Sequence, residues 1–503
     1  MRTVSGPTER VVVVGAGLAG LSAALRLAGA GREVTVLERG SEPGGRAGVV
    51  RQDGYTFDTG PTVLTMPELI ADALDCVGEE LGDWLELLPV EPAYRATYAD
   101  GSRLDLFTDT ERMQQEITEV IGPDAAAGHV RFVEFVSRVY RYEMDDFIDK
   151  NMDSPFSVVT PNLARLVAAG GFRRLAPKVA QYLQDPRLQK AYSFQAMYAG
   201  LAPQDALAIY SVISYMDSVA GVFFAKGGMN AVPRALAGAA EKHGVTFRYD
   251  TEVERVELSG DRAVAVRTTA GERIEADAFV LNPDLPVAWR DLLGRTPRRV
   301  KRLSYSPSCA LLLAGSSAPP REDVLHTISF GHSWEHVFEE LIDERRTMSD
   351  PSFLVTSPSS MDRDLAPAGR HSYYVLFPTP NLDADIDWDA QGPAYRDHMV
   401  QVLEDRGHTG FGDGIEVERL ITPQDWERQG MERGAPFASA HTFTQTGPFR
   451  PRNLWGENVV FAGSGTTPGV GVPMVLISGR LAAERITGPQ ASYHSRARAR
   501  VLR

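Results

Sequence analysis

The hydrophobic pattern at the N-terminus predicts a strand, a tight turn and a helix in immediate succession. Residues 11–14 are four consecutive valines, and an alanine- and leucine-rich stretch runs on to Ala28. The loop between them reads Gly15-Ala-Gly17-Leu-Ala-Gly20, and residues 33–37 form the next apolar run. This β-α-β order is the unit from which doubly wound parallel sheets are built.

The glycine spacing and the acid that follows predict a dinucleotide site. Gly15, Gly17 and Gly20 suit a tight turn that brings a helix N-terminus to a pyrophosphate. Glu38 ends the second strand, where a carboxylate accepts hydrogen bonds from ribose hydroxyls. Because an acid here disfavours a 2′-phosphate, NADP is unfavourable, and NAD and FAD both remain.

The C-terminal pattern repeats the order of strand, glycine loop and helix. Residues 458–462 are apolar, the loop 463–473 is rich in glycine, and a helical pattern runs on to Ile486. We expect backbone amides of this loop and the helix N-terminus to approach the cofactor. The expected binding residues are Gly463, Gly465, Gly471, Val472 and Pro473.

The middle of the chain predicts an insertion in two blocks. Residues 231–243 read as a helix and 245–249, 253–258 and 263–269 as strands that complete the cofactor domain, whereas 84–225 and 298–415 mix short strands with helices. The expected division is a cofactor domain from 1–83, 226–297 and 416–490, a helical substrate part 84–225, a sheet part 298–415 and a basic tail 491–503.

Composition narrows the functional classes. The formal charge of −14 argues against a nucleic-acid-binding protein, and the two cysteines, Cys76 and Cys309, indicate neither a disulfide framework nor zinc. His332, Glu335 and His336 match an inverted zinc-peptidase pattern, but nothing else supports a metal, so none is expected. The low cysteine content fits a reducing cytoplasm, and no apolar window spans a bilayer or reads as a signal peptide.

One segment is basic in an otherwise acidic chain. Residues 161–190 carry six basic side chains and the single acid Asp185, interleaved with apolar residues. This pattern predicts either a surface lying on anionic lipid or a solvated helix packed on the core. The arginines of 496–503 would add to the same attraction.

Several motifs together resemble one flavoenzyme family. Gly44-Gly45-Arg46 follows Glu38, and further motifs lie at 55–63, 223–229, 374–378 and 439–451. With the closing loop they resemble bacterial-type phytoene desaturases over residues 10–488. The resemblance implies FAD as cofactor, with Gly45, Arg46, Gly60 and Pro61 among its binding residues, and a Rossmann-like FAD domain of α/β class carrying an inserted mixed sheet and a helical, membrane-facing domain.

The same resemblance implies the reaction and its partners. The enzyme would remove hydrogen stepwise from phytoene toward lycopene-type carotenes, attached peripherally to the inner face of the membrane, with oxygen or a quinone as electron acceptor. Asp217, His441 and Arg46 are the candidate catalytic polar groups; relatives are proposed to use an acid–arginine pair, for which only Arg165 is present here. An apolar channel is expected, with candidate residues in Tyr192–Tyr198 and Tyr210–Asp217.

Related activities stay open at this point. A carotene isomerase, a C30 desaturase, a carotenoid oxidase and an amine oxidase would all keep the two glycine loops. A lipid-escort protein that has lost flavin is a non-enzymatic alternative, which the retained Glu38, Gly44-Gly45-Arg46 and closing loop argue against.

Overall fold

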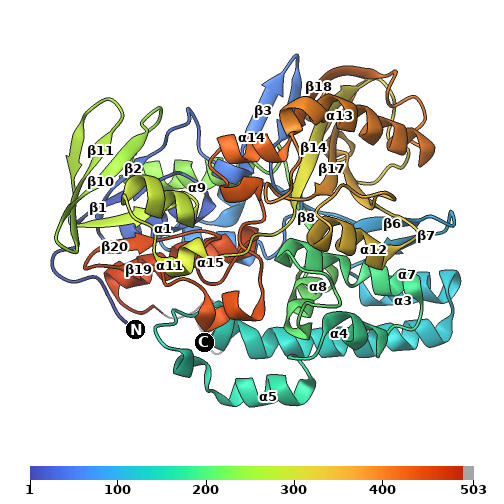
Figure 1. Cartoon of the computed structure of the whole chain (residues 1–503), viewed down its shortest axis with the longest axis horizontal. Helices are drawn as coiled ribbons and strands as arrows, with labels where there is room; N and C mark the ends of the chain where they lie inside the picture. Colours follow the sequence, from blue (N-terminus) through green and yellow to red (C-terminus); the bar gives the residue numbers. More distant parts are fainter. Residues whose placement is uncertain (491–503) are drawn as a thin grey trace.

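The valine run at the N-terminus forms the centre of a six-stranded sheet. In the computed structural model, which describes residues 1–490, β1 (Arg10–Val14) pairs in parallel with β2 (Glu33–Leu37) and β13 (Ala278–Leu281). The sheet order is β19-β20-β13-β1-β2-β9 (Figure 1). The outer strands are β9 (Thr246–Arg248), β20 (Val459–Phe461) and the antiparallel β19 (Leu454–Trp455).

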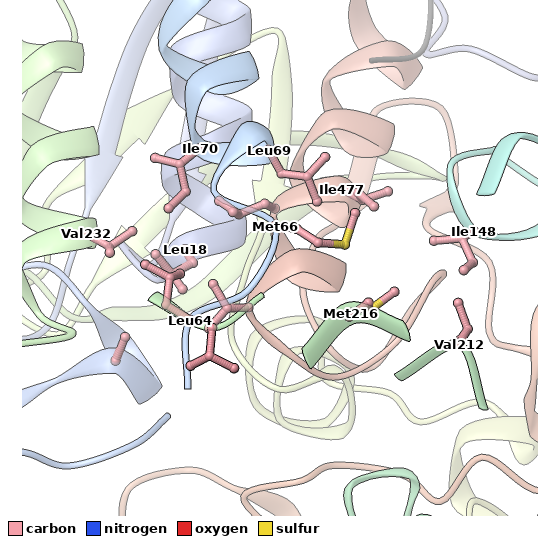
Figure 2. Close-up of a cluster of buried hydrophobic side chains, with 14 of the residues drawn as sticks. Leu18, Leu64, Met66, Leu69, Ile70, Ile148, Val212, Met216, Val232 and Ile477 are labelled. Atoms are coloured by element: carbon pink, nitrogen blue, oxygen red, sulfur yellow. The ribbon is translucent and has the colours of Figure 1, made fainter. Parts of the chain in front are cut away.

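Helices cover one face of this sheet. They are α1 (Leu18–Gly29), α2 (Glu68–Asp75), α9 (Ala231–Lys242) and α15 (Val472–Thr487). A Cβ added to Gly479 would lie 2.3 Å from the carbonyl oxygen of Ala19, so α15 and α1 touch backbone to backbone. Leu18, Leu69, Ile70 and Ile477 from these helices pack into one apolar cluster (Figure 2). The two ends of the chain are therefore joined in one core.

A small antiparallel sheet covers the other face. It contains β10 (Val253–Ser259), β11 (Arg262–Thr268) and β12 (Arg273–Glu275). Val12 and Val14 pack into this second core, whereas Val11 and Val13 face the helices. Burial on both faces is the reason why the strand is apolar at every position. Short helices α10 (Leu285–Val287) and α11 (Arg298–Lys301) follow β13.

A seven-stranded sheet forms the second large layer. Its order is β18-β14-β17-β16-β15-β6-β7, antiparallel except between β15 and β6. The strands are β6 (Tyr94–Tyr98), β7 (Arg103–Leu106), β14 (Ser308–Ser316), β15 (His326–Phe330), β16 (Phe353–Thr356), β17 (His371–Thr379) and β18 (Ile415–Ile421). β6 and β7 come from the first inserted block and β18 crosses the boundary expected at 415, so this sheet draws on both blocks; the division into domains stays a prediction.

The remaining elements frame these sheets. Two-stranded ladders join β3 (Val49–Gln52) to β4 (Tyr55–Asp58) and β5 (Leu87–Pro89) to β8 (Phe223–Ala225). Helices α12 (Trp334–Phe338), α13 (Trp388–Asp405) and α14 (Pro423–Arg428) belong to the part of the chain that carries the seven-stranded sheet (Figure 1).

A helical layer lies along the lower edge of Figure 1. It contains α3 (Thr110–Val120), α4 (Pro123–Glu143), α5 (Pro161–Ala169), α6 (Leu175–Ala180), α7 (Pro186–Ala191) and α8 (Ser211–Ser218). The basic segment 161–190 is three short helices rather than one, because Gly170 takes a left-handed conformation at the end of α5. Leu175, Val179 and Leu183 are buried, so the later part of this segment packs on the core.

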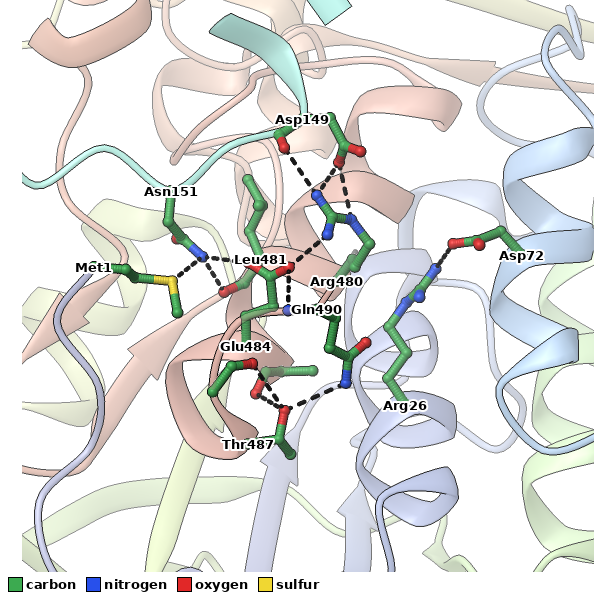
Figure 3. Close-up of polar contacts among 12 residues, drawn as sticks. Met1, Arg26, Asp72, Asp149, Asn151, Arg480, Leu481, Glu484, Thr487 and Gln490 are labelled. Atoms are coloured by element: carbon green, nitrogen blue, oxygen red, sulfur yellow. Dashed lines mark hydrogen bonds and ion pairs between the residues drawn. The ribbon is translucent and has the colours of Figure 1, made fainter. Parts of the chain in front are cut away.

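A buried ionic cluster fixes the helical layer to α15. Arg480 pairs with Asp149 and, at 2.5 Å, with Glu484, and all three side chains are almost fully buried. The amide of Asn151 donates to Glu484 at 3.0 Å (Figure 3). A second buried pair, Arg26 with Asp72 at 2.6 Å, ties α1 to α2. Within residues 1–490, no helix is both long and apolar enough to cross a membrane. The basic tail expected at 491–503 lies outside the described residues.

Candidate cofactor and substrate site

One cavity is lined by residues from both ends of the chain that the sequence predicted to bind the cofactor. Its volume is about 1670 Å³. It is lined by Gly15, Gly17, Glu38, Gly45, Arg46, Gly60, Pro61, Gly463, Gly471, Val472 and Pro473, and also by Asp217 and His441. Gly20 and Gly465 lie behind this lining, where a Cβ would come within 2.2 Å of the Gly15 carbonyl oxygen and 2.5 Å of Leu285 Cβ. These two glycines therefore serve close packing.

Asn282 connects the first glycine loop to the closing strand. Its Oδ1 accepts from the Gly20 amide at 3.2 Å, and its Nδ2 donates to the Ala462 carbonyl at 3.0 Å. A Cβ on Gly17 would lie 2.7 Å from the same Oδ1. No local sequence pattern indicates this contact, because it joins residues distant in the chain.

Glu38 stands at the end of β2 on the cavity wall. Its Oε2 accepts from the Ala16 amide at 2.7 Å and its Oε1 from the Gly40 amide at 2.8 Å. The next loop closes over the first one: the Gly44 amide donates to the Ala16 carbonyl at 3.0 Å. Gly45 adopts φ +55° and faces Gly17, and a Cβ on Gly45 would lie 3.2 Å from the Gly17 Cα, so the two loops approach closely. Such a backbone cradle beside a helix N-terminus fits a pyrophosphate.

Arg46 bridges the loops from the two ends of the chain. Its Nη1 donates to Ser464 Oγ at 3.3 Å and its Nη2 lies 3.5 Å from Asp284. Among the described residues, its buried Nε and Nη2 have no hydrogen-bond acceptor. Donors left open in this way fit a phosphate or a flavin carbonyl.

The closing loop presents a helix N-terminus to the same cavity. α15 starts at Val472, and Gly471, Val472 and Pro473 line the space in front of it. Gly463 and Gly471 have φ values of +119° and +109°, a conformation that favours glycine. The residues present thus fit a flavin dinucleotide, with amides and positive helix ends toward its phosphates and ring.

Beyond the glycine loops the cavity is apolar. On one side it is bounded by the helical layer, through Val158, Leu163, Leu166 and Phe172, and on the other by the seven-stranded sheet, through Leu354 and Leu376. Of the aromatic and methionine candidates, Tyr198, Tyr210 and Met216 line it. Tyr192, Phe194, Met197 and Tyr215 do not belong to the lining; Tyr215 stacks on Tyr140 with ring centroids 4.1 Å apart.

Asp217 places a carboxyl group in this apolar space. It lies on α8 and is 3% exposed, and burial raises its pKa to about 7. The Tyr94 hydroxyl donates to its Oδ2 at 3.4 Å and the Gln195 amide at 3.5 Å. Its Oδ1 has no hydrogen-bond partner among the described residues. The group therefore changes its ionisation near neutral pH, as a proton acceptor must.

His441 lies beside the closing loop but in a different electrostatic setting. Burial, and then the positive charge of Arg450, lower its pKa well below the usual value. The imidazole is neutral at physiological pH and a weak base. Its role as a catalytic group stays a prediction, as do those of Asp217 and Arg46.

Glu143 is a cavity residue that the sequence did not single out. It ends α4, lines the cavity, and burial raises its pKa well above the usual value. Its Oε1 has no hydrogen-bond partner within residues 1–490. Glu143 is one of three acids in the stretch Tyr-Arg-Tyr-Glu-Met-Asp-Asp, so the sequence alone cannot single it out as a cavity residue.

The zinc-peptidase-like segment has a local explanation. His336 pairs with Glu339 at 3.0 Å and with Glu340 at 3.4 Å. In the part of the chain that the structure describes, no group of three or more His, Cys, Asp or Glu side chains could hold a metal ion.

Comparison with known proteins agrees with a flavin site. The family model described as flavin containing amine oxidoreductase matches residues 18–487. The chain is 54% identical over 495 residues to a phytoene dehydrogenase of Streptomyces griseus, covering 97% of each chain. It is 37% identical over 486 residues to a zeta-carotene-forming phytoene desaturase of Myxococcus xanthus, covering 95% of this chain and 94% of that one.

A solved structure shares the fold. An oxidoreductase from Methanosarcina mazei superimposes with a TM-score of 0.60 at 16% identity, covering 94% of this chain and 99% of the other. The relatives match nearly the whole chain, so the similarity includes both glycine loops and the segments that line the cavity.

Proposed function

Because this chain belongs to the flavin-containing amine oxidoreductase family, and within it to the phytoene desaturases, we propose that it desaturates phytoene stepwise to more conjugated carotenes. FAD is the cofactor, held by the residues that line the cavity at the two glycine loops. The enzyme is an oxidoreductase acting on CH–CH groups.

The observation that carries the proposal is the continuity of the cavity. The glycine cradle and the apolar walls from the helical layer and the seven-stranded sheet belong to one space. Phytoene has no charge or hydrogen-bonding group, so only shape and apolar contact can recognise it. Asp217, His441 and Glu143 are buried polar side chains of this lining, which also includes Tyr94, Tyr198, Tyr210 and Tyr374. The relatives described above, rather than the lining alone, favour a polyene over an amine.

The reaction divides each removed pair of hydrogens between two acceptors. Bound FAD supplies the acceptor for one hydrogen with two electrons. The other hydrogen leaves as a proton, and we assign its capture to Asp217, whose pKa near 7 makes the carboxylate available at neutral pH. The apolar lining excludes water and holds the chain of the substrate against the site. The two electrons then pass to oxygen or a quinone.

Because phytoene is apolar and partitions into bilayers, we also propose attachment to anionic membrane. Five exposed apolar side chains form an apolar rim: Phe156, Val159, Val167, Phe172 and Phe443. Phe172 and Phe443 line the cavity as well, so the rim is continuous with the substrate space. The short helix Pro155–Val158 contacts the short helix Gly447–Phe449, which brings the two halves of the rim together.

Basic side chains flank the apolar rim on two sides. Arg165, Arg173 and Arg174 are exposed on α5 and the turn after it. Arg298, Arg299, Lys301 and Arg302 are exposed around α11, and Arg299 donates to the carbonyl of Phe449. In a chain of net charge −14 this local positive surface favours an anionic leaflet, which is the inner face of the cell membrane.

One experiment tests the reaction. The purified holoprotein is incubated with phytoene in anionic liposomes, with oxygen or with a quinone under anaerobic conditions, and absorption spectra are recorded. Longer-wavelength polyene bands that grow in with time support the proposal. Unchanged phytoene, combined with conversion of another polyene, a change of isomer without loss of hydrogen, or peroxide release from amines, would overturn it and assign the related activity.

A further inference from the structure

Arg450 is a buried arginine without an acidic partner. Its side chain is 2% exposed. Its Nε donates to the Thr466 carbonyl at 3.1 Å, its Nη1 to the Gln445 carbonyl at 3.2 Å, and its Nη2 to the Ser464 carbonyl at 2.8 Å and Ser439 Oγ at 3.3 Å. Within residues 1–490, no aspartate or glutamate pairs with it. Four hydrogen bonds to neutral oxygens thus hold the guanidinium, and no acidic side chain within residues 1–490 compensates its charge.

The guanidinium lies directly behind the closing loop. Two of its acceptors, Ser464 and Thr466, are loop residues, and Ser464 lines the cofactor cavity on the other side. Ser464 Oγ also accepts from Arg46 at 3.3 Å. Arg450 itself does not belong to the cavity lining. It therefore acts on bound cofactor through the loop and through its electric field, not by contact.

Two arginines stand at this wall. Arg46 lines the cavity and lies 3.5 Å from Asp284, whereas Arg450 lies behind the loop without an acidic partner among residues 1–490. His441, the neighbouring ring, is neutral because burial and Arg450 depress its pKa. The N-terminus of α15 adds a partial positive charge at Val472. A buried unpaired cation is costly, and a neutral side chain could bond the same carbonyls, so the charge needs a further role.

Reduction of a flavin by two electrons and one proton leaves one net negative charge on its ring. A positive charge in a low-dielectric wall stabilises that charge and does not affect the neutral oxidised ring. We propose that Arg450 is a positioning residue whose buried charge, behind the 463–471 loop, makes bound FAD a stronger two-electron oxidant. This holds whichever polyene the enzyme converts.

The test compares charge with hydrogen bonding at one position. Arg450→Met removes both, Arg450→Gln keeps donors without charge, and Arg450→Lys keeps charge with fewer donors. Arg452→Gln, an exposed arginine two residues on, is the matched control. For each FAD-loaded variant, the two-electron potential is measured by dye equilibration and the affinity for sulfite by titration, because sulfite adds its electron pair to the ring and creates the same negative charge.

We expect about tenfold weaker sulfite binding in Arg450→Met and Arg450→Gln, and a potential lower by the equivalent ~30 mV. Arg450→Lys and Arg452→Gln should stay within about threefold of wild type. Wild-type potential and sulfite affinity in either neutral variant would overturn the proposal. Should neither neutral variant retain FAD, Arg450→Lys decides: if it binds FAD but has lost sulfite affinity, charge is not the determinant and the proposal is wrong.

Discussion

The carboxylate of Asp58 accepts hydrogen bonds from the backbone amides of Asn230, at 3.0 Å, and Met229, at 2.8 Å. Asp58 belongs to the motif 55–63 and the two amides directly follow the glycines of the motif 223–229. A Cβ on Gly228, which has φ +88°, would lie 2.8 Å from the same carboxylate. Two motifs separated by most of the helical layer are therefore halves of one buried contact.

Replacing Asp58 by alanine should destabilise the protein strongly. The change leaves two buried amides without acceptors, at about 1–3 kcal/mol each, so we expect a loss of about 2–6 kcal/mol in the free energy of unfolding. Urea denaturation of the holoprotein measures it. Asp83→Ala, at an exposed position, should change stability by less than about 0.5 kcal/mol. Equal stabilities of the two variants would contradict the role assigned to the contact.

The sequence could predict both motifs but not their contact. Glycines and valines at the two chain ends carry local information, since a strand, a turn and a helix each follow from their own residues. For that reason the sequence could single out the two glycine loops, and Gly15, Gly17, Gly463 and Gly471 line one cavity in the structure. Their role in binding the cofactor stays a prediction. The contacts of Asn282 and Arg450 could not be predicted, because their partners lie in other segments and no local pattern distinguishes such residues.

Alanine at Gly17 and at Gly20 should impair FAD binding in different ways. At Gly20 the new Cβ would meet the Gly15 carbonyl at 2.2 Å, so the loop itself must shift and FAD content should fall below detection. At Gly17 the obstacle is the side-chain oxygen of Asn282 at 2.7 Å, which can move, so we expect about tenfold weaker binding. FAD is quantified by absorbance and by titration of the apoprotein.

Gly82→Ala is the control for these variants. Nothing lies within 4 Å of a Cβ at this position, and its φ is not positive. This variant should retain full FAD content. Wild-type FAD affinity in Gly20→Ala would refute the assignment of the first loop to the cofactor.

The reaction should depend on the ionisation of Asp217. Burial raises its pKa to about 7, and a proton acceptor works only when deprotonated, so kcat/KM should rise as the pH increases to about 7 and then level off. Asp217→Asn should lower kcat by about 10²–10⁴-fold and abolish this limb. Rates are measured from pH 5 to 9 with FAD content verified.

The matched control for this prediction is Asp205→Asn. Asp205 is exposed in the same helical layer and should leave both the rate and the profile unchanged. If Asp217→Asn keeps wild-type activity with an unaltered rise near pH 7, the proton acceptor is another group.

Polar substitution of the apolar rim should release the protein from membranes. Phe156 is 83% exposed and Val159 71%, and each buried side chain is worth about 1.5–3 kcal/mol. The double variant Phe156→Ser, Val159→Ser should therefore bind anionic vesicles more than tenfold more weakly in sedimentation assays, with FAD content unchanged.

A second pair of variants measures how much the positive charges contribute to vesicle binding, independently of the apolar rim. Arg173→Gln with Arg174→Gln should weaken binding to anionic vesicles by roughly 1 kcal/mol per arginine and leave binding to neutral vesicles unaffected. Arg255→Gln, exposed on β10, should change neither. Full binding by the rim variant would place the membrane surface elsewhere.

Removing Arg480 should cost far more than removing a surface arginine. Arg480→Met leaves Asp149 and Glu484 buried without their cation, a change that typically costs about 3–5 kcal/mol. Arg428→Met breaks the exposed pair with Asp389 and should cost less than about 1 kcal/mol. Thermal unfolding of the holoproteins compares them; similar midpoints would show that the cluster is not a stabilising junction.

The basic segment 161–190 is less regular than its sequence pattern indicates. Alternating charges and apolar residues predicted one continuous surface or helix, but Gly170-Gly171 and Pro186 divide it, and both signals are visible in the sequence. Of its large apolar side chains only Val167 and Phe172 are exposed, because Leu175, Val179 and Leu183 pack into a buried cluster whose other members lie in other segments.

β13 lies between β1 and β20 in the six-stranded sheet, and α1 packs on α15, so the fold joins segments that are synthesised early and late. The first glycine loop leaves the ribosome near the beginning of synthesis, whereas β20 and α15 follow only at residues 459–487. Until then β13 is an unpaired sheet edge and the cradle lacks its second wall. We therefore expect flavin to bind only after residues 459–487 have been synthesised, and products that end before residue 459 to expose the edge of β13 to chaperones or proteases.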